Sequence, residues 1–319
     1  MKAVILDADT LGSGDISLAP LTGQPLQWNV YENSEPSQVA AHLANAEVVL
    51  TNKVVIGGEE MDAAPGLRYI GVLATGTNVV DLEAATSRGV VVSNVTNYGT
   101  GSVVQHTWAM ILALVTRLPD YNVAALDGSW ASSGRFCLMD YPVAELAGKT
   151  LGIVGYGQLG RGVAEIGRAF GMNVCVASLP WRHGDQSGRV PLDTLLREAD
   201  VLTLHCPLTE ETRGLIGRRQ LAMMKPQALL INCARGGLVD EQALAEALED
   251  GEIAGAGVDV LSEEPPVNGN PLLNPALPNL IVTPHSAWVA LESRQRLVQQ
   301  AGDNLRAFLT GQPVNVVNG

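Results

Sequence analysis

The chain has 319 residues, of which 46% are hydrophobic, and its formal net charge is -13 at pH 7. This length allows two domains, and the apolar content argues against a disordered chain. The negative charge disfavours nucleic acids and anionic membrane surfaces as partners, because both attract basic faces.

No stretch of the sequence predicts export, a membrane span or a metal. The opening run MKAVILDADT is too short for a signal peptide. The most apolar later run, 103–115, contains Gln105 and His106 and is too short to span a bilayer. The four cysteines form no CxxC pair, so neither a zinc site nor a disulfide framework is expected. We therefore expect a cytoplasmic protein without a metal.

The first hundred residues alternate between short apolar strands and helices. A helix is predicted at 36–43, with Ser34 as its candidate N-cap. Apolar runs predict five strands, at 2–6, 26–31, 47–51, 69–73 and 90–93. This alternation predicts a parallel, doubly wound α/β sheet.

Ligands of such sheets bind beyond the carboxyl ends of the strands, where Lys53, Thr75 and Gly76 lie. We expect Gly76 to open a helix whose backbone N–H groups bind a small carboxylate. A plain turn with Thr77 or Asn78 as a helix cap is the alternative. Lys53, Thr75 and Gly76 are therefore our candidate substrate-binding residues in this part of the chain.

The flexible stretch 97–101 precedes a long amphipathic helix predicted at 102–117, which suits a crossing between domains. The segment 122–141 follows, holds Trp130 and Phe136, and has no clear periodicity. An irregular arm of this kind predicts an interface with a second copy of the chain, and a surface loop is the alternative.

The clearest motif is TLGIVGYGQLG at 150–160, which predicts a buried strand, a glycine-rich turn and a helix. Gly155 allows the tight turn, Gly157 lets backbone approach a pyrophosphate, and Gly160 lets the helix pack on the strand. The helix N-terminus, with Gln158 and Leu159, then faces the anionic phosphates. The turn thus predicts a dinucleotide cofactor.

The remaining chain continues the same alternation. Strands are predicted at 173–177, 201–205, 229–232, 255–258 and 280–283, and helices at 192–198, 217–223 and 241–250. A final helix at 287–309 is expected to return to the first domain. We therefore predict two doubly wound domains with a cleft between them. Residues 1–101 with 287–319 form a flavodoxin-like substrate domain, and 102–286 form a Rossmann dinucleotide-binding domain.

Three polar residues follow strands of the second domain: Arg235, Glu264 and His285. These types suit the reduction of a 2-keto acid. Arg235 can hold the substrate carboxylate in a fork, and His285 can donate a proton to the keto oxygen as hydride arrives. Glu264 can orient the imidazole and stabilise its positive form. Each residue alone could equally be an ordinary cap or loop residue.

The motifs together resemble the D-isomer-specific 2-hydroxyacid dehydrogenases. GYGQLG is similar to that family's cofactor loop, and LHCPLTEETRGLI and MMKPQALLINCARGGLVDEQAL are similar to its second and third signatures. The segments VDV…EEPP and TPHSAW complete the pattern. The resemblance implies that Arg235, Glu264 and His285 are catalytic. It also implies contacts to the cofactor from Thr107, Cys206, Pro207, Thr212, Cys233, Ala234, Asp259 and His285.

The phrase GVLATGTNVVD resembles the glycerate dehydrogenase and hydroxypyruvate reductase branch. This likeness implies NAD(P)H-dependent reduction of hydroxypyruvate or glyoxylate by a homodimer. Another D-2-hydroxy acid remains an alternative, as does a dinucleotide-sensing interaction protein without turnover. Glu264 counts against the formate dehydrogenases, which carry Gln there, and Gln105 departs from the Glu of many relatives.

Cofactor choice depends on Ser178, which lies about 20 residues after the glycine-rich turn. An acid at this position would bind the ribose 2′-hydroxyl of NADH and repel the 2′-phosphate of NADPH. Ser178 removes that repulsion, and Arg182 could pair with the phosphate. We therefore expect NADPH to serve at least as well as NADH.

Overall fold

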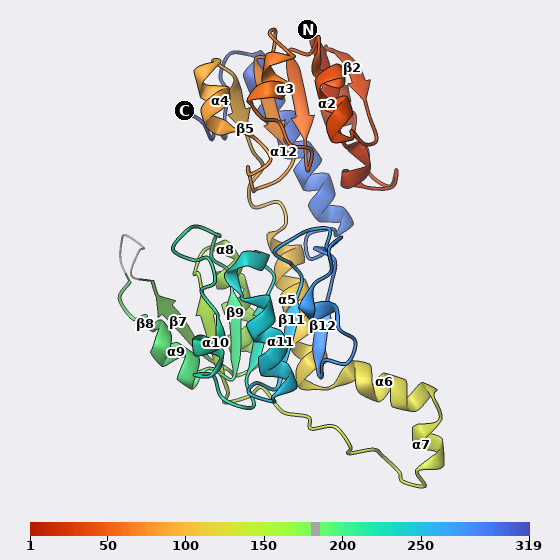
Figure 1. Ribbon diagram of the computed structural model, residues 1–319, viewed down its shortest axis with the longest axis vertical. Helices are drawn as coiled ribbons and strands as arrows, with labels where there is room; N and C mark the ends of the chain where they lie inside the picture. Colours follow the sequence, from red (N-terminus) through yellow and green to blue (C-terminus); the bar gives the residue numbers. More distant parts are fainter. Residues whose placement is uncertain (180–185) are drawn as a thin grey trace. The chain divides into compact units, whose positions relative to one another are not determined.

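The computed structural model describes residues 1–179 and 186–319, which form two compact units. Unit 1 comprises Met1–Gly99 and Trp288–Gly319, and unit 2 comprises Thr100–Ala287. Each unit contains one parallel sheet with helices packed on it (Figure 1). The predicted fold class, two doubly wound α/β domains, is confirmed.

Unit 1 is built on a five-stranded sheet in the order β2-β1-β3-β4-β5, which is the flavodoxin-like order. Its strands are β1 (Lys2–Ile5), β2 (Gln27–Val30), β3 (Val48–Thr51), β4 (Tyr69–Val72) and β5 (Val91–Ser93). Its helices are η1 (Ala8–Leu11), α1 (Ala19–Thr22), α2 (Pro36–Leu43), α3 (Gly58–Asp62), α4 (Leu82–Ser87) and α12 (Leu291–Leu309). Val4 of β1 packs in one apolar cluster with α2, α3 and α4, whereas its neighbours Ala3 and Ile5 pack in another with α1 and α12. The sheet is therefore covered on both faces.

Unit 2 is built on a seven-stranded sheet in the order β12-β11-β10-β9-β6-β7-β8. Its strands are β6 (Thr150–Val154), β7 (Asn173–Ser178), β8 (Val190–Pro191), β9 (Val201–Leu204), β10 (Leu229–Asn232), β11 (Gly255–Val258) and β12 (Leu280–Val282). Its helices are α5 (Thr100–Val115), α6 (Leu118–Leu126), α7 (Ser129–Ser132), α8 (Gln158–Ala169), α9 (Leu192–Glu198), α10 (Arg218–Leu221), η2 (Gly236–Leu238), α11 (Glu241–Glu249) and η3 (Pro271–Leu273). This is the Rossmann strand order with one added strand at the β12 edge. The two-residue β8 was not predicted.

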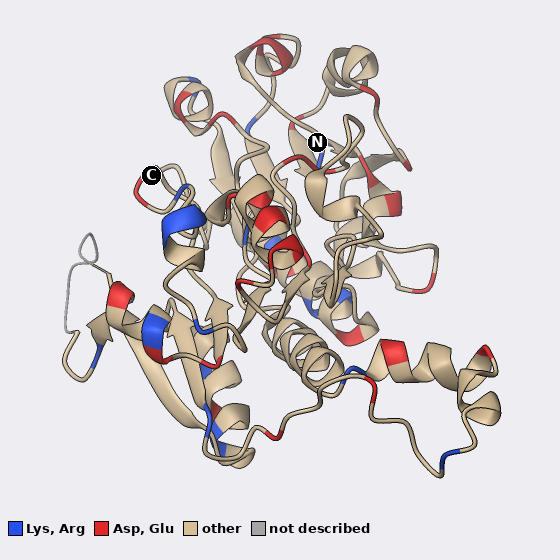
Figure 2. Cartoon of the chain, turned by 60° about the horizontal axis from the view of Figure 1, so that its bottom comes forward, with Lys and Arg blue, Asp and Glu red and all other residues tan. Residues whose placement is uncertain are grey.

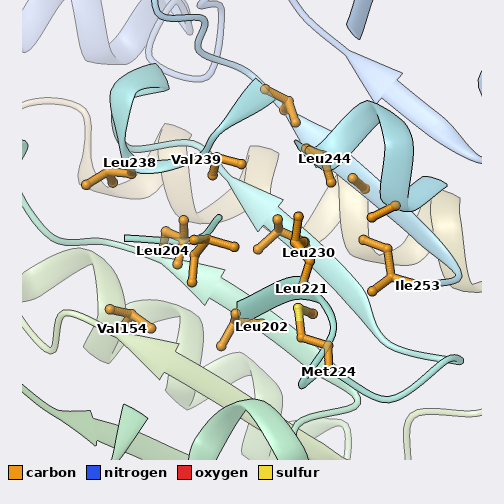
Figure 3. Packing of buried hydrophobic residues seen from close by; sticks show 14 of the residues in the cluster. Val154, Leu202, Leu204, Leu221, Met224, Leu230, Leu238, Val239, Leu244 and Ile253 are labelled. Atoms are coloured by element: carbon orange, nitrogen blue, oxygen red, sulfur yellow. The ribbon is translucent and has the colours of Figure 1, made fainter. Parts of the chain in front are cut away.

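The core beneath β9 and β10 fixes these strands and hence the loops at their ends. Leu202 and Leu204 of β9 and Leu230 of β10 pack against Leu221 of α10 and Leu244 of α11 (Figure 3). All five side chains are fully buried. Burying one leucine contributes roughly 1.5–3 kcal/mol, so this cluster holds the strand ends firmly.

One predicted N-cap and one predicted helix start are wrong. The N-cap of α2 is Glu35, whose N–H donates to the side-chain oxygen of Gln38 (3.0 Å), and not Ser34. The Ser34 hydroxyl instead donates to the carbonyl of Leu6 (2.7 Å). The final helix α12 begins at Leu291 rather than at residue 287.

The segment expected to be irregular, 122–141, is helical in its first part, because α6 and α7 occupy much of it. Both helices project from the body of unit 2 (Figure 1), and the arm carries both acidic and basic residues (Figure 2). Within residues 1–179 and 186–319, no single helix is long and apolar enough to cross a membrane. One bent pair, α5 with α6, passes that test by length and composition alone.

Candidate active site

The glycine-rich turn joins β6 to α8, and its three glycines meet three different surroundings. Gly155 has φ +95°, and a Cβ there would lie 2.5 Å from the backbone of His205. A Cβ on Gly160 would collide with the carbonyl oxygen of Gly155. A Cβ on Gly157 would meet no atom within 4 Å. Two glycines thus permit close packing, and Gly157 leaves open space beside the start of α8.

The first turn of α8 offers backbone donors at that open space. α8 begins at Gln158, and the N–H groups of a helix's first residues, here including Leu159, have no partner within the helix. They carry the positive end of the helix dipole, which favours an anion. The turn therefore fits the pyrophosphate of a dinucleotide, with Gly157 to Gly160 as the residues that would hold it.

A histidine and a carboxylate lie side by side in the loops that follow β12 and β11. Nδ1 of His285 lies 2.7 Å from Oε2 of Glu264. The second oxygen, Oε1, accepts the backbone N–H of Leu261 (2.8 Å), which fixes the carboxylate. Both side chains are about one-third exposed, at 32% and 34%. Because an ionised carboxylate only accepts, Nδ1 carries the hydrogen and Nε2 is left for a reacting molecule.

The loop that carries His285 is held by the buried carboxylate of Asp259, which is 1% exposed. Oδ1 of Asp259 accepts from the hydroxyl of Thr283 (2.5 Å) and from the N–H of Ser286 (2.8 Å). Oδ2 accepts the N–H of Ala287 (3.0 Å). The N–H of His285, whose φ is +52°, donates to the carbonyl of Asp259 (2.8 Å). Asp259 was predicted as a cofactor contact, and in this structure its carboxylate organises the histidine loop.

Thr283 also contacts a histidine of α5 that the sequence did not assign to the site. Nε2 of His106 lies 3.0 Å from the Thr283 hydroxyl and 3.5 Å from Oδ1 of Asp259. The sequence offered only a lone histidine early in a helix. Its partners follow β11 and β12, so no local pattern could reveal this contact.

Arg235 follows β10, the strand beside β11. Its Nη1 donates to the carbonyl of Ala234 (2.7 Å), and its own carbonyl accepts from the side chain of Asn232 (2.9 Å). The next residue, Gly236, packs directly against the backbone of Leu261 and Ser262. The arginine loop and the loop that carries Glu264 are therefore in contact. The structure thus gathers Arg235, Glu264 and His285 at the carboxyl ends of β10, β11 and β12.

Several other predicted cofactor residues are buried. Cys206, Cys233 and Ala234 are between 5% and 8% exposed. Burial raises the pKa of the Cys206 thiol to about 11 and that of the Cys233 thiol to about 12, so both stay protonated. Thr107 is fully buried, and its hydroxyl donates to the carbonyl of Val103 (2.8 Å).

Thr212 shapes the turn that follows β9. Its hydroxyl donates to the carbonyl of Pro207 (2.8 Å) and accepts the N–H of Thr209 (2.7 Å). Thr212 is 1% exposed, whereas Pro207 lies on the surface. Thr212 therefore supports the turn, and Pro207 is the residue that faces outward.

Ser178 and Arg182 were predicted to determine the choice between NADH and NADPH. Ser178 ends β7, and its hydroxyl donates to the carbonyl of Val190 on β8 (3.1 Å). Its hydrogen is therefore already used inside the protein. Arg182 lies outside the described residues.

In unit 1, the predicted helix at Gly76 is absent, since α4 begins at Leu82 with Asp81 as its N-cap. Thr77 and Asn78 are therefore not its cap either. Thr75 is exposed and Gly76 is half-buried. Within the described chain, the N–H groups of Thr75 and Gly76 donate to no protein atom. An anion could still bind there, through loop amides instead of a helix terminus.

Lys53 follows β3, and its backbone N–H donates to the buried carboxylate of Asp7 (2.6 Å). Asp7 also accepts the N–H groups of Asn52 (3.0 Å) and Val54 (3.2 Å). The Lys53 ammonium lies 6.0 Å from the centre of the Trp288 ring. Sequence reasoning missed Asp7, although an acid at the end of a buried strand is a signal for such a role.

Comparison with known proteins agrees with this arrangement. Residues 108–287 match the family model described as "D-isomer specific 2-hydroxyacid dehydrogenase, NAD binding domain". The chain belongs to the D-isomer specific 2-hydroxyacid dehydrogenase family, and it is an NAD(P)-dependent oxidoreductase. The predicted family is thus confirmed.

Two curated relatives match nearly the whole chain. Glycerate dehydrogenase of Methylorubrum extorquens is 44% identical over 317 residues, which cover 99% of this chain and 98% of the relative. Hydroxypyruvate reductase of Blautia hydrogenotrophica is 40% identical over 323 residues, with both chains covered completely. Among solved structures, the NADPH-dependent glyoxylate/hydroxypyruvate reductase of Sinorhizobium meliloti, in complex with NADP and malonate, has a TM-score of 0.83. It is 29% identical, with 99% of this chain and 96% of that chain covered.

Proposed function

We propose that this protein reduces hydroxypyruvate to the D-2-hydroxy acid, or glyoxylate to its achiral 2-hydroxy acid, with NAD(P)H. The observation that carries the proposal is the 2.7 Å hydrogen bond between His285 and Glu264 beside the arginine loop. The names of the relatives at 44% and 40% identity support these substrates over other 2-keto acids. Hydroxypyruvate and glyoxylate are small, so they need only a carboxylate site and a proton donor beside the nicotinamide.

Each residue has a distinct task in the proposed reaction. A nicotinamide dinucleotide, when bound with its pyrophosphate at the glycine-rich turn, would supply the hydride that the keto carbon accepts. His285 donates the hydrogen on Nε2 to the keto oxygen, which becomes the hydroxyl. Glu264 stabilises the positive imidazole before that transfer by charge and hydrogen bonding. Arg235 binds the substrate carboxylate in a planar fork, and Lys53 and the amides of Thr75 and Gly76 are the proposed contacts on unit 1.

The test is a panel of hydroxypyruvate, glyoxylate, pyruvate and phosphohydroxypyruvate, each with NADH and with NADPH. We expect the highest kcat/KM for one of the first two acids. His285→Ala serves as the control for contaminating reductases. Preference for pyruvate or phosphohydroxypyruvate would contradict the substrate proposal, and nucleotide binding without any turnover would favour a sensor.

We further propose that NADPH serves at least as well as NADH. The support is that Ser178 ends β7 without a carboxylate, so a 2′-phosphate meets no repulsion at this position. The Ser178→Asp variant should shift the preference towards NADH. A wild type that favours NADH by about tenfold, or 1.4 kcal/mol, would contradict this proposal.

We also propose that two copies associate through the arm 122–141. Leu126, Phe136 and Met139 are 80%, 96% and 81% exposed, which is unusual for large apolar side chains in a lone chain. Light scattering at assay concentration should give twice the chain mass, and Phe136→Asp with Leu126→Asp should lower it. A monomer mass for the wild type would contradict the proposal.

A further inference from the structure

The loop that carries Thr75 and Gly76 is tied to the next strand by a buried asparagine. Asn94 directly follows β5, the neighbour of β4 in the sheet, and is 7% exposed. Its side-chain N–H donates to the carbonyl of Thr75 (2.8 Å). The Thr75 hydroxyl donates to the carbonyl of Val95 (2.9 Å). The two residues that follow β5 therefore each bond to Thr75.

Two further asparagines hold Asn94 in place. The carbonyl of Asn94 accepts from the side chain of Asn304 on α12 (2.8 Å), which is 2% exposed. The side-chain oxygen of Asn304 accepts from the side chain of Asn315 (2.8 Å) in the C-terminal tail. The N–H of Asn94 donates to the carbonyl of Asn315 (3.2 Å). This asparagine ladder, Asn94–Asn304–Asn315, holds both backbone polar groups of Asn94 and so fixes the point from which its side chain reaches Thr75.

The bond from Asn94 also orients the N–H of Gly76, although it does not touch that group. The Thr75 carbonyl and the Gly76 N–H belong to one planar trans peptide, so they point in opposite directions. A carbonyl that is fixed toward buried Asn94 therefore directs the Gly76 N–H away from the core. That N–H has no acceptor among the described residues, as expected of a donor reserved for a ligand.

We propose that Asn94 is a positioning residue that directs the Gly76 N–H at the carboxylate of the substrate. This inference rests on the proposed function, because it assumes a 2-keto acid whose carboxylate meets the Thr75–Gly76 loop. A purely structural role would predict a loss of stability alone. A positioning role also predicts weaker binding of the carboxylate, with binding of the cofactor unchanged.

The sharpest variant is Asn94→Asp, which keeps the shape of the side chain but removes its donor. An oxygen then faces the Thr75 carbonyl, and the two acceptors repel each other. We expect the KM for glyoxylate and the inhibition constant of oxamate, an unreactive analogue, each to rise about tenfold. The KM for the nucleotide should stay at the wild-type value, and kcat should change much less than KM.

Asn318→Ala is the matched control. The Asn318 side chain accepts the N–H of Val92 (2.9 Å) and donates to the carbonyl of Val90 (2.8 Å), so it links the same tail to β5 away from the loop. It should lower Tm without changing KM for glyoxylate. If Asn94→Asp does not fold, Asn315→Gly loosens the far end of the ladder while keeping the left-handed backbone of that residue (φ +52°). Its KM for glyoxylate should also rise, by less.

The outcomes separate this inference from the proposed function. Wild-type KM values in Asn94→Asp, or in Asn315→Gly when that variant is the one that folds, overturn the positioning role and leave the proposed function intact. An equal rise of KM in Asn318→Ala also overturns it, because the effect would then follow general loosening. A wild type that reduces neither hydroxypyruvate nor glyoxylate refutes both.

Discussion

Replacement of Asp259 by Asn tests whether the buried carboxylate holds the catalytic loop. The substitution keeps the side-chain shape, so it opens no cavity. The carboxylate accepts from Thr283, Ser286 and Ala287 through two oxygens. An amide has one oxygen, so its NH2 group must face the N–H of either Ser286 or Ala287, and one buried donor loses its acceptor.

The magnitude follows from these contacts. An orphaned buried N–H costs about 1–3 kcal/mol, and the remaining bonds lose roughly 1 kcal/mol with the charge. The sum of about 2–4 kcal/mol corresponds to a fall in Tm of about 4–16 °C for a domain of this size. Because the His285 N–H donates to the carbonyl of Asp259, the imidazole should shift as well. A shift of about 1 Å would lower kcat on the order of 10²-fold.

The assay combines thermal unfolding with steady-state kinetics on glyoxylate. Asp240→Asn is the control, because Asp240 caps α11 by accepting the N–H of Ala243 (3.0 Å), and Asn caps helices equally well. We expect the control to match the wild type in Tm and kcat. An Asp259→Asn protein with wild-type Tm and kcat would refute the proposed role of the carboxylate.

Three further predictions concern the site and its pH dependence. His285→Ala should lower kcat by about 10²–10⁴-fold while the Kd of the nucleotide is kept; equal losses in both would place the histidine in cofactor binding. Arg235→Lys should raise KM for the keto acid and lower kcat, because an ammonium cannot form the planar fork; near-normal kinetics would show that the carboxylate is held elsewhere. Burial lowers the pKa of His205 from 6.5 to about 4 in the folded chain. As the pH falls, this histidine therefore binds a proton in the unfolded chain before it does so in the folded chain. The free energy of unfolding, which has its full value above pH 6.5, then falls by about 1.4 kcal/mol per pH unit towards pH 4. His205→Asn should flatten this fall in urea unfolding series, and an unchanged slope would count against it.

Most strands other than β8 were predictable because their sequences are largely apolar. Each fully buried strand, such as 229–232 or 255–258, shows four buried residues in succession, as parallel sheets covered on both faces require. Helix caps were harder to predict, because a cap depends on what else competes for the polar side chain. Ser34 is a good N-cap by type, but its hydroxyl donates to Leu6, 28 residues away in the sequence.

The gathering of Arg235, Glu264 and His285 followed from the rule that parallel strands end at one edge. That rule needs only the positions at which the strands end, which the apolar runs of the sequence indicate. It gives no information about how a loop leaves its strand. Gly76 therefore suggested a helix start, whereas the chain continues as a loop to Asp81 before α4 begins.

The residues that orient the reacting groups could not be predicted from the sequence, for a different reason. Asp259 and Thr283 are 24 residues apart, and Asn94 and Asn304 are 210 apart. A buried polar side chain needs a partner, but the sequence does not say which of many distant donors will reach it. Residue type and strand position thus predict where chemistry can occur, and only the folded contacts decide which amides and carboxylates direct it. The Asn94 and Asp259 variants test this directly. If both behave as expected, the Gly76 N–H and the His285 imidazole are oriented by residues whose side chains touch neither the substrate nor the proton donor.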